Sequence, residues 1–136
     1  MRDSSCIFCK IAGGEIAPKT VYESPEAICF LDLEPKAPGH ALVIPRYHAP
    51  SLPELPDELV GPLFLAVKAA AGILAEKLGT PDLTIGINQG AAARQGVPHL
   101  HVHLLPRFPG DGGGSMHTVF DNPPVSLDDI HHTLTT

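Results

Sequence analysis

One long helical pattern stands between two groups of short β-prone segments, and this order constrains the fold more than any other feature. Apolar residues recur at steps of three and four between residues 57 and 78, which predicts an amphipathic helix. They are Leu59, Leu63, Val67, Ala70, Leu74 and Leu78. The β-prone runs are 20–22, 27–31 and 40–44 before the helix, then 83–88 and 97–105 after it. Short connections within each group favour antiparallel pairing, so we expect an α+β domain with a five-stranded antiparallel sheet and the helix across one face.

The ends of the predicted helices follow from their capping residues. Asp57 is a suitable N-cap for the long helix, and Gly79 is suited to the position just past its end. Pro62 would clash with the carbonyl four residues earlier, so either the helix kinks there or its regular part begins near Gly61. Two short helices are also expected, at 7–12 and at 127–134.

Size and charge exclude several classes of protein. The chain has 136 residues, the size of one ordinary domain. Its formal net charge of −6 argues against a nucleic-acid partner, because binding to a phosphate backbone needs a positively charged surface. No apolar run approaches the roughly 20 residues of a membrane helix, and the N-terminus lacks the apolar region of a signal peptide. We therefore expect a soluble, cytoplasmic protein with no membrane partner.

Three histidines, His99, His101 and His103, alternate with apolar residues in the last β-prone run. Alternate residues of a strand point to one face, so the three imidazoles are expected side by side, with neighbours ~6.6 Å apart along the backbone. Two neighbours can reach one metal ion, whereas three in a straight row cannot easily do so. We therefore expect the three histidines to divide their tasks.

Three interpretations of this row are open. The first is an ordinary solvated polar face. The second is a catalytic metal held by two histidines with an open coordination position, although residues 97–108 contain no carboxylate that would assist it. The third makes the central His101 a nucleophile that attacks phosphorus, after which water hydrolyses the nucleotidyl-histidine. The small-residue loop from Gly90 to Gly96 favours the third interpretation, because its backbone N–H groups could face a phosphate.

The pair Cys6-x-x-Cys9 indicates a metal site, for which two more ligands are needed. His48 and His99, at the ends of predicted strands, are the candidates, and they would make a closed Cys₂His₂ zinc site. Two buried, inert thiols are the alternative, while a thioredoxin-like redox pair lacks the βαβ context it requires. The remaining Cys29 lies in an apolar run and is interpreted as a small core residue.

Short motifs spaced along most of the chain form a recognisable set. They are Cys6-Ile-Phe-Cys9-Lys-Ile, Glu15-Ile16, Val21-Tyr22-Glu23, Phe30-Leu31-Asp32, Ala37-Pro38-Gly39-His40-Ala-Leu-Val-Ile-Pro45, His48, Asn88-Gln-Gly90, Gln95-Gly-Val97 and His99-x-His101-x-His103. This set resembles the histidine triad (HIT) family, and within it the Hint-like branch. The resemblance makes 1–136 a single HIT domain, with a core over about 6–107 and a C-terminal tail over 108–136.

The resemblance implies a nucleotide hydrolase or transferase. Such a protein cleaves a purine nucleoside monophosphate from a phosphoramidate or related substrate through a nucleotidyl-histidine intermediate. A dinucleoside polyphosphate hydrolase is one alternative, because the run from Leu104 to Asp111 is also seen among those enzymes. A nucleotide-binding interaction protein with low turnover is the other. The resemblance also implies a homodimer, in which the long helix and the fourth strand pair across a two-fold axis to make a ten-stranded sheet.

Carried over by position, the resemblance assigns four catalytic residues. His101 is the expected nucleophile, and His103 is expected to contact the α-phosphate and to assist the leaving group. His99 is the first triad member, and it is also a ligand where the Cys pair holds structural zinc. His40 is expected close behind the triad. The zinc ligands implied are Cys6, Cys9, His48 and His99.

The resemblance also assigns the nucleotide-binding residues. Asp32 is expected to accept hydrogen bonds from the ribose hydroxyls, and Asn88, Gln95 and the backbone of Gly96 are expected near the phosphate. The apolar wall of the base is assigned to Ile7, Phe8, Ile11, Phe30 and Leu31. Two positions depart from the family pattern. Arg94 replaces the usual small residue, and Gly96 replaces a hydroxyl residue that serves the leaving group in the eukaryotic Hint branch.

Overall fold

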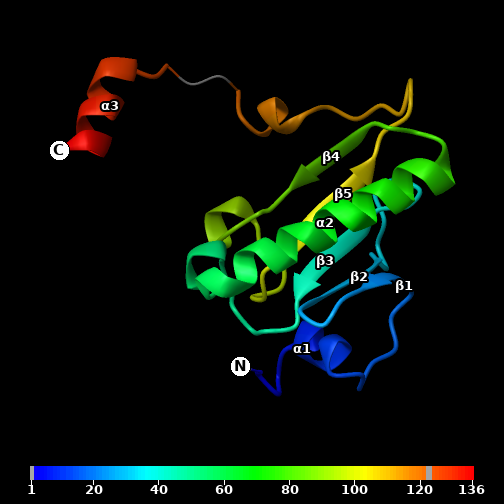
Figure 1. Cartoon of the computed structure of the whole chain (residues 1–136). Helices are drawn as coiled ribbons and strands as arrows, with labels where there is room; N and C mark the ends of the chain where they lie inside the picture. Colours follow the sequence, from blue (N-terminus) through cyan, green and yellow to red (C-terminus); the bar gives the residue numbers. More distant parts are fainter. Residues whose placement is uncertain (1, 122–123) are drawn as a thin grey trace.

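An antiparallel sheet of five strands forms the centre of the computed structural model, which describes residues 2–121 and 124–136 (Figure 1). The strands are β1 (Thr20–Glu23), β2 (Ala27–Leu31), β3 (Ala41–Pro45), β4 (Leu83–Gly86) and β5 (Val102–Pro106). They lie in the order β1-β2-β3-β5-β4, and every neighbouring pair is antiparallel. The predicted α+β fold is confirmed, because the long helix crosses one face of this sheet (Figure 1).

The helices begin and end close to the predicted residues. They are α1 (Ile7–Ala12), α2 (Asp57–Leu78) and α3 (Leu127–Thr135), with short 3₁₀ helices at Leu52–Glu54, Ala91–Ala93 and Met116–Val119. The N-cap of α2 is Pro56, so the assignment of Asp57 as the cap is wrong by one residue. Helix α2 runs through Pro62, which excludes a regular start near Gly61. At its end Gly79 adopts the left-handed conformation, with φ 70°, which glycine takes without the steric penalty of a Cβ.

The alternation of side chains along the strands divides the core into two clusters. Ala27 and Cys29 of β2 pack with α2, whereas Ile28 and Phe30 of the same strand pack with α1 on the other face. Strands β3 and β5 follow the same period of two: Val102 and Leu104 join the α2 side. His103 lies between these two residues, opposite Leu42 of β3. It is therefore placed on the sheet face that carries α1.

Helix α2 has the length and the apolar composition to cross a membrane, with a mean hydropathy of 1.7 over its most apolar 18-residue window. Its buried residues are Leu63, Ala66, Val67, Ala70 and Leu74. All five belong to the cluster that packs against the sheet. Packing against the sheet accounts for these five residues, while Phe64 and Leu65 on the other side of α2 expose 39% and 66% of their surface.

Strand β5 starts five residues later than predicted, at Val102. The N–H of His99 donates to the carbonyl of Val97 at 2.8 Å, which closes a three-residue turn around Pro98. Because proline fixes φ near the value that such a turn needs, the chain bends where the alternating pattern predicted a strand. The predicted straight row is therefore wrong: only His103 lies in a strand, and His99 and His101 precede it. Strand β4 is also shorter than predicted and ends at Gly86.

Candidate functional site

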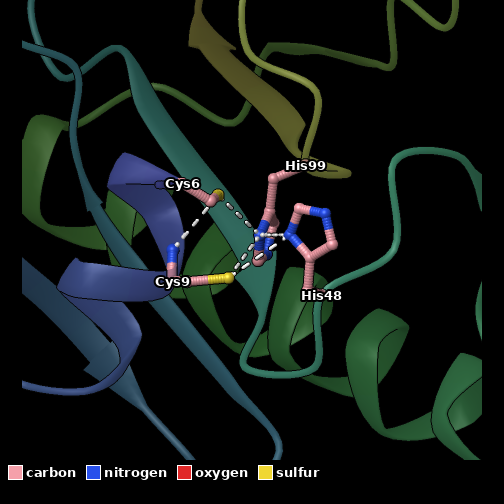
Figure 2. Close-up of side chains that lie close together, drawn as sticks. All are labelled: Cys6, Cys9, His48 and His99. Atoms are coloured by element: carbon pink, nitrogen blue, oxygen red, sulfur yellow. Dashed lines mark hydrogen bonds between the residues drawn. The ribbon is translucent and has the colours of Figure 1, made fainter. Parts of the chain in front are cut away.

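Four side chains from three separate segments meet at one point, as Figure 2 shows. Cys6 and Cys9 come from α1 and its N-cap, His48 follows β3, and His99 precedes β5. Cys6 Sγ lies 3.3 Å from His99 Nδ1, and Cys9 Sγ lies 3.3 Å from His48 Nδ1. All four ligand atoms are within 4.8 Å of one another. The structure thus brings together the complete set of residues predicted to bind zinc.

Backbone contacts fix the orientation of His99 in this cluster. Its Nε2 lies 2.8 Å from the carbonyl oxygen of Pro45, and a carbonyl can only accept, so Nε2 carries the proton. Burial lowers the pKa of His99 to about 4, despite the opposing effect of the Pro45 hydrogen bond. The ring is therefore neutral near pH 7, and its Nδ1 presents a lone pair to the two cysteines and His48.

This donor set fits a zinc ion. Nδ1 of His48 and Nδ1 of His99 are 3.2 Å apart, and Cys9 Sγ is 3.6 Å from the latter. Ligands at ordinary Zn–N and Zn–S distances around a tetrahedron would be roughly 3.3–3.8 Å apart. Burial raises the pKa of the Cys6 thiol, so a thiolate at this position needs a cation to stabilise it. Four clustered lone pairs with tetrahedral spacing are typical of a closed zinc site.

The central histidine is held by a second carbonyl. His101 Nδ1 lies 2.8 Å from the backbone oxygen of His99, so Nδ1 donates and the lone pair of the neutral ring is on Nε2. Phe8 packs edge-on against His101 with ring centroids 5.2 Å apart, and against His99 at 5.8 Å. These contacts fix both the tautomer and the plane of the ring whose Nε2 is free.

A chain of hydrogen bonds orients His103. The N–H of Lys36 donates to His40 Nδ1 at 3.1 Å, so His40 carries its proton on Nε2. That Nε2 is 3.0 Å from His103 Nδ1, which must accept. His103 is therefore left with a proton on Nε2 and can donate from that atom. Asp32 flanks the pair, with Oδ2 3.6 Å from His40 Nε2.

Electrostatics keep this pair of histidines neutral. Burial, together with the neighbouring His101 and His40 and against the opposing charge of Asp32, lowers the pKa of His103 to about 4. Burial also lowers the pKa of His40, again opposed by Asp32. An open pocket of about 430 Å³ lies over Asp32 and His40 and is lined by the loop between β2 and β3. A ligand in this pocket can therefore reach the carboxylate of Asp32.

Of the three residues predicted near the phosphate, Gln95 has its side chain hydrogen-bonded to the protein backbone, whereas Asn88 and Gly96 are exposed. The Gln95 side chain is fully hydrogen-bonded to backbone groups: Nε2 donates to the carbonyls of Pro50, which follows β3, and of Val97 at 2.8 and 2.9 Å, and Oε1 accepts from Gly90 N–H at 2.8 Å. Asn88 and Gly96 are exposed. Arg94 occupies the left-handed region with φ 63°, the only non-glycine residue to do so in the described parts of the chain. Gln95 therefore shapes the loop, and its neighbours face solvent.

The predicted apolar wall divides into buried and exposed residues. Phe8, Ile11 and Phe30 are buried in the cluster around α1, where Phe8 also contacts Phe30. Ile7 and Leu31 expose 47% and 36% of their surface and are accessible to a ligand. Sequence reasoning missed the carbonyl of Pro45, the N–H of Lys36 and the imidazole contacts of Phe8. The two backbone groups carry no side-chain signal by which a motif could have identified them.

Comparison with known proteins identifies the family. A family model described as the HIT domain matches residues 13–110. The chain belongs to the HIT family. An uncharacterized HIT-like protein of Methanocaldococcus jannaschii is 43% identical over 107 residues, which are 79% of this chain and 82% of that protein. A crystal structure of a HIT-family member from Bacillus subtilis matches with a TM-score of 0.83 and 35% identity, over 96% of this chain and 95% of that one.

A relative with a named activity lies in the Hint-like branch. Adenosine 5′-monophosphoramidase HNT1 of Saccharomyces cerevisiae is 41% identical over 105 residues, which are 77% of this chain. The match covers 64% of the yeast protein, so the chain spans less than two thirds of that relative's length. The resemblance to the HIT family that the sequence motifs carried is confirmed.

Proposed function

We propose that this HIT protein cleaves a purine nucleoside monophosphate from a phosphoramidate or a related substrate, with His101 as the nucleophile. The observation that carries the proposal is the pair of fixed tautomers. His101 has its free lone pair on Nε2, because Nδ1 is bound to a carbonyl. His103 has its proton on Nε2, because Nδ1 accepts from His40. A lone pair and an N–H donor side by side, with ring centroids 5.0 Å apart, suit attack on a phosphorus centre.

The reaction proceeds in two displacements. His101 Nε2 forms a bond to phosphorus, and the bond from phosphorus to the leaving nitrogen or oxygen breaks. His103, which contacts the phosphate, gives its Nε2 proton to the leaving group. Water then attacks phosphorus and returns a proton to His103 Nε2, the N–P bond breaks, and the nucleoside monophosphate leaves with both histidines as they began. Asp32 accepts hydrogen bonds from the ribose hydroxyls, and the exposed N–H of Gly96 faces the leaving group.

The proposal includes a structural zinc ion and a homodimer. Cys6, Cys9, His48 and His99 would hold the zinc, which would supply no chemistry beyond fixing α1 beside the segment that precedes β5. Two copies would pair through α2 and β4 to make a ten-stranded sheet. Phe64 and Leu65 of α2 and Ile85 of β4 support this pairing, because they expose 39%, 66% and 43% of their surface. The proposed location is cytoplasmic.

The proposal is tested by trapping the covalent intermediate with radiolabelled adenosine 5′-phosphoramidate and quenching without acid. We expect an adenylyl group on His101. His101→Ala should lose the adduct and about 10³-fold or more of the turnover, yet still bind AMP. His117→Ala, at an exposed histidine of the tail, is the matched control and should be unaffected. Inversion at a chiral phosphorus, or an adduct that survives in His101→Ala, would contradict the assignment.

A substrate panel separates this activity from its alternatives. Adenylyl and guanylyl phosphoramidates are compared with dinucleoside polyphosphates under the same conditions. Faster turnover of the phosphoramidates supports the proposal, and faster turnover of the polyphosphates overturns it in favour of the second hydrolase class. Tight nucleotide binding with no adduct and negligible turnover on either class would indicate a binding protein.

A further inference from the structure

The short segment before α1, residues 2–5, has no part in the site described above, yet it is fixed to the helix that carries the cysteines. The Arg2 guanidinium donates to the carbonyl of Cys9 at 3.0 Å and to the carboxylate of Glu15 at 3.2 Å. Gly13 leaves room for this guanidinium, because a Cβ there would overlap it. We call residues 2–5 the N-terminal strap, since they are held across the end of α1.

Asp3 of the N-terminal strap contacts three of the four residues in the Cys₂His₂ cluster. Its N–H donates to Cys9 Sγ at 3.3 Å, and its carbonyl accepts from the N–H of Cys6 at 3.1 Å. Its carboxylate Oδ2 lies 4.0 Å from Nε2 of His48, the ring nitrogen opposite the Nδ1 that faces Cys9. Asp3 thus connects α1 and its N-cap to the segment that follows β3.

The Asp3 carboxylate is itself held in place. Its Oδ1 accepts from the N–H and the hydroxyl of Ser5, at 2.9 and 2.7 Å, so Oδ2 is the oxygen on the side of His48. A histidine that binds metal usually donates its second ring N–H to a carboxylate or a carbonyl, and this partner fixes the ring. The carbonyl of Pro45 has this place for His99, at 2.8 Å from Nε2. The carboxylate of Asp3 has the corresponding place for His48.

An open hollow of about 590 Å³ adjoins the cluster at His48. It is lined by Arg2, Asp3 and Ser4 of the N-terminal strap, together with residues 47–50 and Glu54. Of the four clustered residues, His48 alone is not buried, and its side chain exposes 12% of its surface. The cluster therefore faces solvent on the side where the Asp3 carboxylate lies.

We propose that Asp3 is the positioning residue that retains zinc in the Cys₂His₂ cluster, and that the hollow beside His48 is the path by which the ion enters and leaves. The inference rests on the zinc site proposed above. When Nδ1 of His48 binds the ion, Nε2 carries a proton, and the Asp3 carboxylate attracts that N–H and holds the ring toward the metal. The strap's N–H also stabilises the thiolate of Cys9. Asp3 touches no residue of the proposed reaction.

Zinc retention tests the proposal. Asp3→Asn removes the charge beside His48 and leaves the backbone contacts of the N-terminal strap in place. The full chain is loaded with zinc, and transfer of the ion to a chromophoric chelator is followed at one fixed pH. Asp3→Asn is expected to weaken zinc binding by about tenfold or more and to speed release of the ion. Glu54→Gln removes an equal charge from the same hollow, at a carboxylate that accepts from Ser51, and should retain the wild-type affinity.

The outcomes distinguish this inference from the site on which it rests. A wild type that takes up no zinc would overturn the Cys₂His₂ site and the inference together. Wild-type zinc affinity and release in Asp3→Asn would overturn the inference and leave the site intact. Equal losses in Asp3→Asn and Glu54→Gln would show that the total charge of the hollow attracts the ion, and would overturn the positioning role of Asp3.

Cobalt substitution gives a readout that a purely structural role would not change. The visible absorption bands of Co²⁺ held by two thiolates and two imidazoles depend on how each ligand is oriented. Asp3→Asn is expected to shift these bands, because the ring of His48 is no longer held, and Asp3→Glu, which keeps the carboxylate, should restore them at least in part. Identical cobalt spectra in the wild type and Asp3→Asn would show that Asp3 does not position His48, and would overturn the proposal.

Discussion

A carbonyl oxygen can only accept a hydrogen bond, and at the scale of single residues two carbonyls decide what the histidines of this site can do. The oxygen of Pro45 gives His99 a lone pair on Nδ1, which faces the cysteines. The oxygen of His99 gives His101 a lone pair on Nε2. The N–H of Lys36 has the opposite effect on His40 and, through it, leaves a proton on Nε2 of His103. Identical side chains thus acquire different chemistry from their backbone partners.

Substitution of Asp32 tests the ribose contact. Its carboxylate is half-buried beside the open pocket, and charge-assisted hydrogen bonds of this kind contribute about 1.5–3 kcal/mol. Asp32→Asn should weaken AMP binding by about that amount. It should also narrow the difference in affinity between AMP and its 2′-deoxy analogue, and calorimetry measures both effects. Glu34→Gln, at an exposed carboxylate two residues later, is the control and should preserve both. An unchanged preference for the ribonucleotide in Asp32→Asn would count against this role.

The low pKa of His103 makes stability depend on pH. The unfolded chain protonates this histidine near pH ~6.5, whereas the folded protein does so near a pKa of about 4. Between these values the unfolded state binds more protons, so the free energy of unfolding falls as the pH drops from 6.5 to 4. His103→Asn should remove about 1–2 kcal/mol of that fall, after allowance for partial exposure. Urea unfolding of the wild type and His103→Asn at pH 7 and pH 4.5 measures this difference. An equal fall in the free energy of unfolding of the two proteins would contradict the expectation.

At the scale of elements, periodicity predicted most of the structure. The step of three and four located α2 to within about one residue at its start, because its buried stripe is long enough to average out single exceptions. Strands β2 and β3 were found because both faces of the sheet are covered and nearly every residue is apolar. The start of β5 was predicted wrongly. The alternation of histidines with apolar residues indicated a strand from residue 97, but the turn around Pro98 interrupts the extended backbone there. Local turn geometry overrode the β-propensity of the segment.

The candidate site was predictable to a similar degree. The Cys pair and the histidines at strand ends identified the cluster of Cys6, Cys9, His48 and His99, since metal ligands carry their chemistry in the side chain. Gln95 was expected at the phosphate, but its amide bonds to three backbone groups of its surroundings. A sequence shows which atoms a side chain has and not which backbone groups will satisfy them.

Pro62 provides a prediction about α2. It lies in the helix interior at the sixth helical residue, where it removes a backbone hydrogen bond and crowds the preceding turn at a cost of about 3 kcal/mol. Part of that cost is offset because proline restricts the unfolded chain. Pro62→Ala should therefore raise the free energy of unfolding by about 1–2 kcal/mol in urea titrations. Pro56→Ala, just before the first helical turn, is the control and should not raise the free energy of unfolding. A Pro62→Ala protein no more stable than the wild type would show that the backbone of the turn has relaxed around the proline.

At the scale of the whole molecule, the cluster around His99 joins parts of the chain that lie far apart in sequence. Cys6 and His99 are 93 residues apart, and their side chains are 3.3 Å apart. Helix α1 has only six residues, too few to be stable alone, and it forms the buried cluster on the second face of the sheet. A cation at this point would therefore connect the N-terminal segment to the residues that orient His101.

The corresponding prediction separates stability from turnover. If zinc is structural, the purified protein holds one zinc ion per chain, and Cys9→Ser loses it. Because metal binding contributes directly to folding free energy, the melting temperature of Cys9→Ser should fall by about 10 °C or more, while turnover per folded molecule changes far less. Cys29→Ala is the matched control: it also removes a buried thiol, one whose pKa burial raises to about 12, and it should keep its zinc. A chelator should lower the melting temperature of the wild type and leave Cys9→Ser unchanged. Full stability without bound metal would show that the two thiols and two imidazoles pack without an ion, and retained zinc in Cys9→Ser would place the metal elsewhere.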